Sequence, residues 1–455
     1  MRTFHRLVAN TLLAGMTNNL IWFALTFWAY LETRSVIASS VIGGAYMLLL
    51  AGSGLFFGTF VDRHRRKTAM LISSAASLTA YLAAGLLYLV TPADDMRDLG
   101  RPEFWALTFL VLAGAIAGNL RAIALATSVT LLVPAERHAR ANGLVGMTNG
   151  VAFALTSVFS GLSVGLLGMG WSIVITVGLT GAALLHLSTI AMDEPAPEPS
   201  GGPASAFDLH GALRAVRDVP GLLTILYFST FNNLLGGVFM ALVDPYGLTL
   251  VSVESWGVVL AVTSAGFIIG GLIVARRGLG ARPVRVLLLT NLAMWSLTVL
   301  FPLRSSIVML AVGFLVYMTL IPIAEAAEQT TIQRVVPLGT QGRVFGFAQS
   351  LETAASPITS FLIGPIAQVW VIPFMTTGAG ASAIGGWFGT GPARAMALLF
   401  IGAGLLGLLV TVLAMRSRGY ARLSARYATL AHRRPANAQI TDQVPEREAA
   451  LAAAA

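Results

Sequence analysis

The sequence predicts an all-α membrane protein with twelve transmembrane helices, on the basis of its composition, its apolar runs and the placement of its charges. The chain of 455 residues is 56% hydrophobic and only 11% charged, with a mean hydropathy of +0.77. A soluble protein of this composition would have too few polar groups to cover its surface. Runs of ~20 apolar residues can cross a bilayer, and they must do so as helices because lipid offers no partner to unpaired backbone groups.

Twelve runs reach this length, and charged residues are concentrated in the short segments between them. With approximate limits, the predicted spans are 7–31, 36–61, 68–90, 104–133, 141–167, 171–192, 221–243, 256–275, 284–301, 307–332, 344–372 and 395–415.

The basic residues predict the orientation of the chain in a plasma (inner) membrane. Loops rich in Arg and Lys stay in the cytoplasm, and here they follow the second, fourth, eighth and tenth spans. We therefore expect both termini in the cytoplasm. The basic start of the chain precedes a run too long for a secretory signal, so we expect a retained first span. The even-loop residues are Arg63, Arg65, Arg66, Lys67, Arg137, Arg140, Arg276, Arg277, Arg282, Arg285, Arg334 and Arg343.

Composition also excludes several classes of function. The net charge of +9 follows the positive-inside pattern and does not indicate nucleic-acid binding. There is no cysteine, hence no disulfide framework. The only lysine, Lys67, follows Arg66 rather than the glycine of a P-loop, so an ion gradient, a substrate gradient or a partner must supply any energy. We predict no cofactor and no metal site.

The composition changes between the sixth and seventh spans. Residues 193–220 begin with a stretch rich in Pro, Gly and Ser, which predicts a cytoplasmic linker between six-span bundles at 1–192 and 221–415. The tail 416–455 is first basic and amphipathic and then polar and Ala-rich, and its last part is expected to be disordered. The stretch 373–394 is predicted to be a long outer loop, which either caps the outer mouth or serves only as packing.

The two halves repeat weakly, which argues for parallel six-helix repeats related by an axis along the membrane normal. The matching positions are Asn18-Asn19-Leu20 with Asn232-Asn233-Leu234, Gly58 and Arg63 with Gly271 and Arg276, and Pro134, Arg140, Gly143 and Gly161 with Pro337, Arg343, Gly346 and Gly364.

The segment 58–67, GTFVDRHRRK, closes the second span with an acid and a cluster of bases. It resembles the loop between helices 2 and 3 of the major facilitator superfamily of transporters, although Arg65 stands where that family usually has a small residue. A generic positive-inside loop is the simpler interpretation. The resemblance implies that Asp62 contacts the start of the eleventh span near Gly342, where the helix dipole favours an anion, and locks the inner gate. The predicted gate motif is Gly58, Asp62, Arg63, Arg66 and Lys67.

A second, shorter resemblance concerns the junction of the tenth and eleventh spans. Residues 333–337 and 341–346 look like the same junction in bacterial siderophore, macrolide and multidrug exporters. Drug–proton antiporters of the superfamily often carry a Gly-Pro motif on the fifth span. Here that span has Gly146, Gly150 and Ala154 but no proline, which departs from the strict antiporter pattern.

Charged residues inside spans are costly, at least ~2.5–3.5 kcal/mol each, and so indicate a polar cavity or a partner. Arg121 on the fourth span and Glu325 on the tenth lie roughly 18–20 Å above the inner loops, near the midplane. In the superfamily, spans 1, 4, 7 and 10 line a central cavity, so the resemblance implies that these two residues face one another across a substrate path.

Glu328 lies one turn from Glu325 on the same helix face. Two carboxylates this close repel when both are ionised, which suits a proton carrier. The alternatives are a structural ion pair of Arg121 with a helix, or a pairing of Glu328 with Arg334. Glu352 on the eleventh span falls where the repeat has Asn149, so it is included in the predicted substrate and proton pathway as a cavity-edge position. The alternative, which we favour, is a hydrogen bond to a neighbouring helix.

Polar and aromatic residues of the first and seventh spans complete the predicted substrate pathway. Asn19 and Asn233 each belong to an Asn pair of which at most one member faces the cavity, because adjacent residues point about 100° apart. Trp22 and Phe23 could wall a pocket for an apolar or cationic compound. An interfacial belt accounts equally well for Trp28 and the nearby Tyr30.

We interpret the chain as a secondary transporter and not as an enzyme. We predict that it exports a small amphipathic molecule by alternating access, coupled to a proton gradient, and we expect a monomer. Uptake of a nutrient, or a lipid flippase or sensor on the same fold, are the alternatives. The string GxSxG at 161–165 and His186 suggest an intramembrane serine protease, but Ser163 and His186 are predicted at depths about 15 Å apart.

Overall fold

The computed structural model describes residues 2–33, 36–194 and 208–432. The described residues are almost entirely helical, with no strand among them. Most of the predicted flexible stretch between the sixth and seventh spans, and the predicted disordered end of the tail, lie outside the described residues.

Each half of the chain contains six long helices, which confirms the predicted fold class. Eleven helical segments among the described residues are long and apolar enough to cross a membrane, and α6, the counterpart of the fifth predicted span, is outside that set. The first half holds α1 (Arg2–Thr33), α2 (Val36–Arg63), α3 (Arg66–Val90), the short α4 (Ala93–Arg97), α5 (Pro102–Leu132), α6 (His138–Leu162) and α7 (Gly168–Ser188). The second half holds α9 (Leu222–Leu248), α10 (Val253–Arg277), α11 (Pro283–Leu300), α12 (Ile307–Val335), α13 (Gln341–Ile366) and α16 (Pro392–Arg416).

The internal repeat is visible in irregular backbone as well as in the long helices. A 3₁₀ turn precedes α6 at η1 (Ala135–Arg137) and precedes α13 at η4 (Leu338–Thr340). A π-helical turn, a rare conformation, ends α6 at η2 (Ser163–Leu167) and α13 at η5 (Ala367–Val371).

The Asn pairs of the repeat also make equivalent contacts. Asn18 of α1 accepts a hydrogen bond from the Tyr81 hydroxyl of α3, and Asn232 of α9 accepts one from the Trp295 indole of α11; both pairs are 63 residues apart in the chain. One member of each Asn pair thus ties two helices of its own bundle together, which leaves the other member for a different role.

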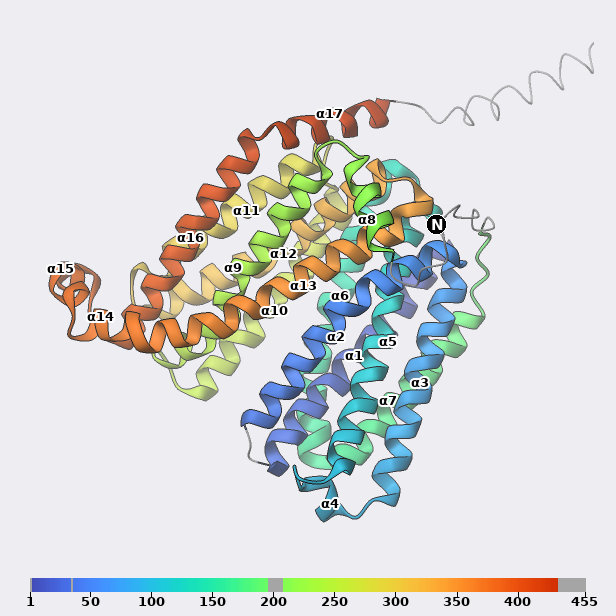
Figure 1. Cartoon of the computed structure of the whole chain (residues 1–455), viewed down its shortest axis with the longest axis horizontal. Helices are drawn as coiled ribbons and strands as arrows, with labels where there is room; N and C mark the ends of the chain where they lie inside the picture. The colour runs from blue at the N-terminus through green and yellow to red at the C-terminus, as the bar shows by residue number, and fades with distance from the viewer. Residues whose placement is uncertain (1, 34–35, 195–207, 433–455) are drawn as a thin grey trace, which may run out of the picture.

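The prediction of a long outer loop over 373–394 is wrong. This stretch forms α14 (Ile372–Thr376) and α15 (Ala379–Phe388), with Gly389 at φ 91° ending the second helix. The helices are anchored by Arg394, which donates to the carbonyl of Phe388 and, at 3.0 Å, to that of Pro302. In Figure 1, α15 projects at the outer edge of the second half, away from the other half, so this stretch packs on its own bundle and does not cap the mouth.

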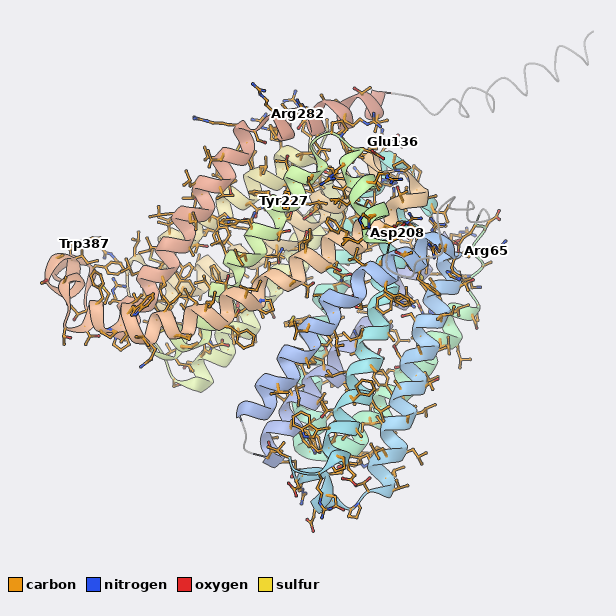
Figure 2. All side chains as sticks on the ribbon, in the orientation of Figure 1. Arg65, Glu136, Asp208, Tyr227, Arg282 and Trp387 are labelled. Carbon is orange, nitrogen blue, oxygen red and sulfur yellow. The ribbon has the colours of Figure 1, made fainter. Side chains whose placement is uncertain are left out.

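The two halves meet at one end and diverge toward the other (Figure 1). The linker helix α8 (Leu209–Arg217) and the tail helix α17 (Arg418–His432) lie at the meeting end. Figure 2 places Arg65 and Arg282 there as well, with Trp387 at the opposite side. We call the meeting end the basic end, because the Arg-rich loops lie on it, and the other the far end.

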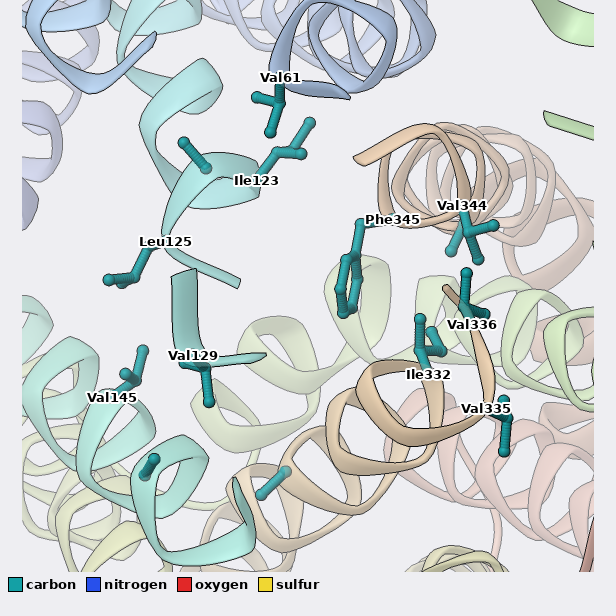
Figure 3. Close-up of a cluster of buried hydrophobic side chains, with 14 of the residues drawn as sticks. Val61, Ile123, Leu125, Val129, Val145, Ile332, Val335, Val336, Val344 and Phe345 are labelled. Atoms are coloured by element: carbon teal, nitrogen blue, oxygen red, sulfur yellow. The ribbon is translucent and has the colours of Figure 1, made fainter. Parts of the chain in front are cut away.

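The buried apolar side chains explain why the halves meet where they do. Two of the large clusters stay within one half each, whereas the third contains residues of both. Figure 3 shows this third cluster, in which Val61 of α2 and Ile123 of α5 lie near Ile332 of α12 and Val344 and Phe345 of α13. The apolar core that joins the bundles therefore lies at the basic end.

Backbone contacts without intervening side chains bring the halves together along two helix pairs. α2 packs on α13 and α10 packs on α6. A Cβ on Gly58 would overlap the carbonyl oxygen of Gly342, and one on Gly346 would overlap that of Gly54. Small residues at such crossings let helix backbones approach closely within a membrane. The close approach of α2 to α13 therefore depends on glycine at these positions.

Gly58→Ala should weaken this conformer. The added methyl group forces α2 and α13 apart, at a cost of about 1–3 kcal/mol for overpacking. Spin labels on Arg65→Cys and Gly339→Cys in the naturally cysteine-free chain should report a longer or broader distance. Gly52→Ala on the same helix is the control, because a Cβ there meets nothing within 4 Å. Unchanged distances in both variants would contradict the prediction.

Candidate gate and transport cavities

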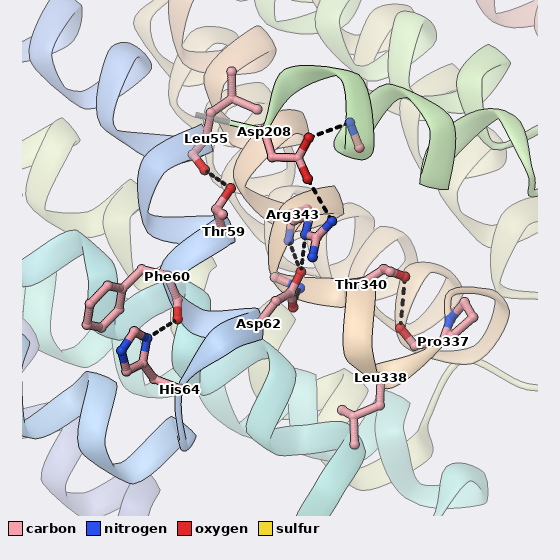
Figure 4. Close-up of polar contacts among 12 residues, drawn as sticks. Leu55, Thr59, Phe60, Asp62, His64, Asp208, Pro337, Leu338, Thr340 and Arg343 are labelled. Atoms are coloured by element: carbon pink, nitrogen blue, oxygen red, sulfur yellow. Dashed lines mark hydrogen bonds and ion pairs between the residues drawn. The ribbon is translucent and has the colours of Figure 1, made fainter. Parts of the chain in front are cut away.

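The carboxylate of Asp62 lies against the first turn of α13. It accepts hydrogen bonds from the backbone N–H groups of Gly342 at 2.7 Å and Arg343 at 3.0 Å, and the guanidinium of Arg343 lies 3.4 Å away (Figure 4). The side chain of Asp62 is completely buried. A helix N-terminus presents unpaired N–H groups and a positive dipole end, both of which favour an anion. The expected contact of Asp62 with Gly342 is thus present; its role in gating stays a prediction.

Arg343 extends this contact to the linker. Its guanidinium also donates to Asp208 at 2.8 Å, and Asp208 caps α8 by accepting from the N–H of Gly211 at 2.8 Å (Figure 4). One arginine at the start of α13 therefore joins α2 of the first half to the linker helix. Asp208 was not predicted as a functional residue, because its only signal in the sequence is its place before a short amphipathic segment.

The remaining gate-motif residues have different surroundings. Arg66 is buried and donates to the carbonyl of Leu338 at 3.2 Å, so it also bridges the halves. The backbone N–H groups of Arg66 and Lys67 both bind the carboxylate of Glu194, at 2.6 and 2.8 Å. Glu194, predicted to belong to a flexible linker, is a buried cap on α3. Arg63 is half-buried, and among the described residues its side chain makes no hydrogen bond or ion pair.

Two pairs of amide side chains join the halves above the carboxylate contact. Asn142 of α6 and Gln333 of α12 exchange hydrogen bonds at 2.8 and 3.2 Å, and Gln333 also reaches the carbonyl of Ala126 at 2.9 Å. Asn119 of α5 and Gln349 of α13 exchange bonds at 3.2 and 3.0 Å. None of these four residues was predicted to pair with another; their signal in the sequence is an amide side chain within or beside an apolar span.

A cavity of about 470 Å³ opens among α1, α3, α5, α6 and α7 of the first half and α10 and α12 of the second. Arg121, Asn19 and Glu325 all line it. The guanidinium of Arg121 donates to Asn10 and, at 3.5 Å, to Ser74, and none of the ion pairs among the described residues includes it. The alternative of a structural ion pair for Arg121 is therefore wrong for this conformer.

A second cavity of about 390 Å³ lies among α2, α5, α9, α12 and α13. Glu325 and Gln329 line both cavities, which therefore adjoin at α12. Glu328, Glu352 and Asn233 line the second cavity. The four predicted polar residues of the second half are thus brought to one region.

The carboxyl groups of Glu328 and Glu352 interact directly. They lie within hydrogen-bonding range of one another, and Glu328 also interacts with Ser229. One oxygen of each carboxyl group is buried without a partner in the described part of the chain. Glu328 does not pair with Arg334, whose guanidinium instead donates to the carbonyl of Leu430 at 3.1 Å.

The predicted aromatic wall does not line either cavity. Trp22 stacks on Tyr46 with ring centroids 4.3 Å apart, and Phe23 packs against Phe27 and Phe153. Trp28 is buried and stacks on Phe104. The aromatic side chains that line the first cavity are Tyr81, Phe153 and Phe267.

The protease pair is not assembled. The hydroxyl of Ser163 lies 2.7 Å from that of Ser172, whereas His186 lies 3.2 Å from the amide nitrogen of Asn10 on α1. A serine nucleophile needs its base within hydrogen-bonding reach, and these two side chains are engaged elsewhere.

Asp62→Asn should destabilise the conformer closed at the basic end. Hydrogen bonds to a charged group contribute about 1.5–3 kcal/mol, and the neutral amide can accept only part of them. We expect the population with a short distance between labels at positions 65 and 339 to fall about tenfold or more relative to the open population. Asp94→Asn, at an exposed site, is the control; an unchanged distance distribution for Asp62→Asn would contradict the gating role.

Asp208→Asn should shift the same equilibrium in the same direction but by less. Asparagine caps helices about as well as aspartate, so α8 is retained and only the ion pair with Arg343 is lost. Because Asp208 is 25% exposed, solvent screens the pair and we expect less than about 1 kcal/mol. An effect equal to that of Asp62→Asn would mean that α8 itself had detached. Spin labels placed along α8 would then lose the mobility pattern of a helix.

Comparisons with known proteins agree with this architecture. A family model described as the Major Facilitator Superfamily matches residues 7–360. The enterobactin exporter EntS of Shigella boydii serotype 18 is 25% identical over 368 residues, and that of Escherichia coli O139:H28 is 24% identical, each alignment covering 79% of this chain and 82% of the exporter.

Solved structures share the fold at low sequence identity. A bacterial homologue of the iron transporter ferroportin in an outward-facing state has a TM-score of 0.71 at 13% identity, covering 92% of this chain and 100% of the homologue. The human organic anion transporter MFSD10 has a TM-score of 0.63 at 16% identity, covering 90% and 99%. The chain therefore belongs to the major facilitator superfamily of membrane transporters.

Proposed function

We propose that this protein exports a small amphipathic molecule across the plasma membrane by alternating access, coupled to the proton gradient. The observation that carries the proposal is a cavity between the two bundles that brings Arg121 and Glu325, from opposite halves, to one space. Charged groups within a membrane are costly unless a polar pathway uses them. A binding site between two repeats that move relative to each other is the basis of alternating access.

The position of the basic loops, at the end where the two halves meet, supports an outward-facing state. Arg-rich loops favour the cytoplasm, so we assign the basic end to the cytoplasm. At this end the halves are held by Asp62 and by the amide pair of Asn142 and Gln333, while the bundles diverge at the far end (Figure 1). Substrate leaving the cavity would therefore meet the outside.

Export rather than uptake is favoured by the exporter-like segments and by the relatives that this chain matches. The exporter-like segments 333–337 and 341–346 supply Gln333 and Gly342, both of which bind the first half. Relatives that align with 79% of this chain are named as enterobactin exporters. The resemblance thus includes residues that hold the two halves together in this chain.

The acidic residues support proton coupling. Glu325 is exposed within the cavities, and Glu328 and Glu352 adjoin one another one turn away. Two neighbouring carboxylates repel when both are ionised, so a proton shared between them lowers the energy. Glu325 can exchange protons with water in the cavities. The pair of Glu328 and Glu352 can then hold one proton between its two carboxyl groups.

Glu325→Gln should abolish flux driven by a pH gradient, because an amide cannot carry a proton. We would reconstitute the protein in liposomes, impose a pH gradient and follow a panel of siderophores, drugs and metabolites. Flux should fall at least tenfold in the variant, while exchange of substrate between equal pools continues.

Glu136→Gln is the control, since it makes the same chemical change at an exposed site near the basic end. Full gradient-driven flux in Glu325→Gln would remove the proton role. Accumulation in the direction of uptake, at the physiological gradient and orientation, would favour a nutrient transporter instead.

A further inference from the structure

The charge of Arg121 has no counter-ion in the described part of the protein. Its side chain is only 5% exposed, and what it exposes faces the first cavity. No carboxylate lies within 4 Å of it among the ion pairs of the described residues, although Glu325 lines the same cavity. An uncompensated buried charge costs several kcal/mol, so the fold retains Arg121 at the expense of stability.

The donors of Arg121 are also incompletely used. A guanidinium carries five N–H groups, and here its partners are Asn10 and Ser74, the latter at a long 3.5 Å. Its Nε is buried without a partner. Both partners are neutral, and a neutral partner orients a guanidinium without cancelling its charge.

Asn10 orients the guanidinium of Arg121 from the buried side. It is completely buried, and its amide nitrogen donates to the carbonyl of Ala183 at 2.8 Å, which directs its oxygen toward Arg121. The wall beside Arg121 continues with hydroxyl and amide groups, including those of Ser73, Ser77 and Asn18. A fixed cation among neutral polar groups in a cavity of about 470 Å³ suits one bound anion, since cavities of this size take ligands of drug-like dimensions.

We propose that Arg121 is the seat for an anionic group of the transported molecule, so that the substrate is an organic anion, such as a carboxylate, a sulfonate or an ionised phenol. Arginine binds a carboxylate with two parallel hydrogen bonds, and a hydrogen bond to any charged acceptor is about twice as strong as a neutral one. The bound anion supplies the counter-charge that the protein lacks. That the bound anion is a transported substrate rests on the proposed function, whereas the binding of an anion at Arg121 does not.

The test compares three ligands of one shape and different charge. They are 1-naphthoate, 1-naphthamide and 1-naphthylmethylamine, titrated calorimetrically at pH 7 into purified full-length protein in nanodiscs without any gradient. We expect naphthoate to bind about tenfold or more tightly than naphthamide, because a charge-assisted contact contributes at least one factor of ten. The amine should bind more weakly than either.

Two variants locate the preference. Arg121→Gln should remove it, bringing naphthoate to the affinity of naphthamide. Asn10→Asp keeps Arg121 but gives it an internal carboxylate, and it should also bring the ratio of naphthoate to naphthamide affinity toward one. Because Asn10→Asp retains the arginine, it remains informative if Arg121→Gln fails to fold. Arg101→Gln, on the exposed surface, is the matched control and should keep the preference.

Equal affinities for the three ligands in the wild type, no binding of naphthoate, or an intact preference in Arg121→Gln or Asn10→Asp would each overturn the anion seat. None of these measurements involves a gradient or a direction. If the seat is confirmed but liposomes show no coupled export, then the proposed function fails and the binding site stands.

Discussion

The closed end of this transporter depends on one close approach, that of α2 to the N-terminus of α13. The carboxylate of Asp62 reaches two backbone N–H groups there, which is possible only because Gly58 and Gly342 let the backbones touch. The pseudo-symmetric contact of α10 with α6 is equally close at Gly143, but the repeat has Ala275 where the acid would be. One interface therefore combines packing with a charged contact, while the other lacks the corresponding acid.

The charges within the membrane are divided between the halves. Arg121, from the first half, lies among neutral polar groups, whereas Glu325, Glu328 and Glu352 belong to the second half. The two cavities that hold them adjoin at Glu325 and Gln329. A motion of one bundle against the other would change the surroundings of Glu325, because this residue lines both cavities. The proposed coupling of proton and substrate would then follow from position rather than from a contact between the two sites.

The sequence predicted the helices well, because apolar runs long enough to cross a bilayer must fold as helices. It predicted partners between helices poorly. The pairing of Asn142 with Gln333 depends on how each helix is rotated about its own axis, and adjacent residues differ by about 100° in direction. The same uncertainty explains why Trp22 packs on Tyr46 instead of lining the cavity. Glu194 was missed for another reason: composition describes a segment on average and cannot identify the one residue in it that folds back as a cap.

The strength of the gate is limited by what must open it. Moving an equilibrium from 1:99 to 99:1 takes about 5.5 kcal/mol of differential binding, and lipid supplies no hydrophobic force between helices. Neutral hydrogen bonds such as those of Asn142 and Asn119 contribute about 0.5–1.5 kcal/mol each, and the charged contact of Asp62 about 1.5–3. Summed over these contacts, the contribution is of the same order as that differential binding, so a bound substrate or proton can offset it. A gate built from several buried ion pairs would be costly to form, because each charge must be removed from water. If one partner moved away during opening, the buried charge left behind would cost still more free energy. Two pairs of amide side chains together with the charged contact of Asp62 therefore suit a protein that has to open and close repeatedly.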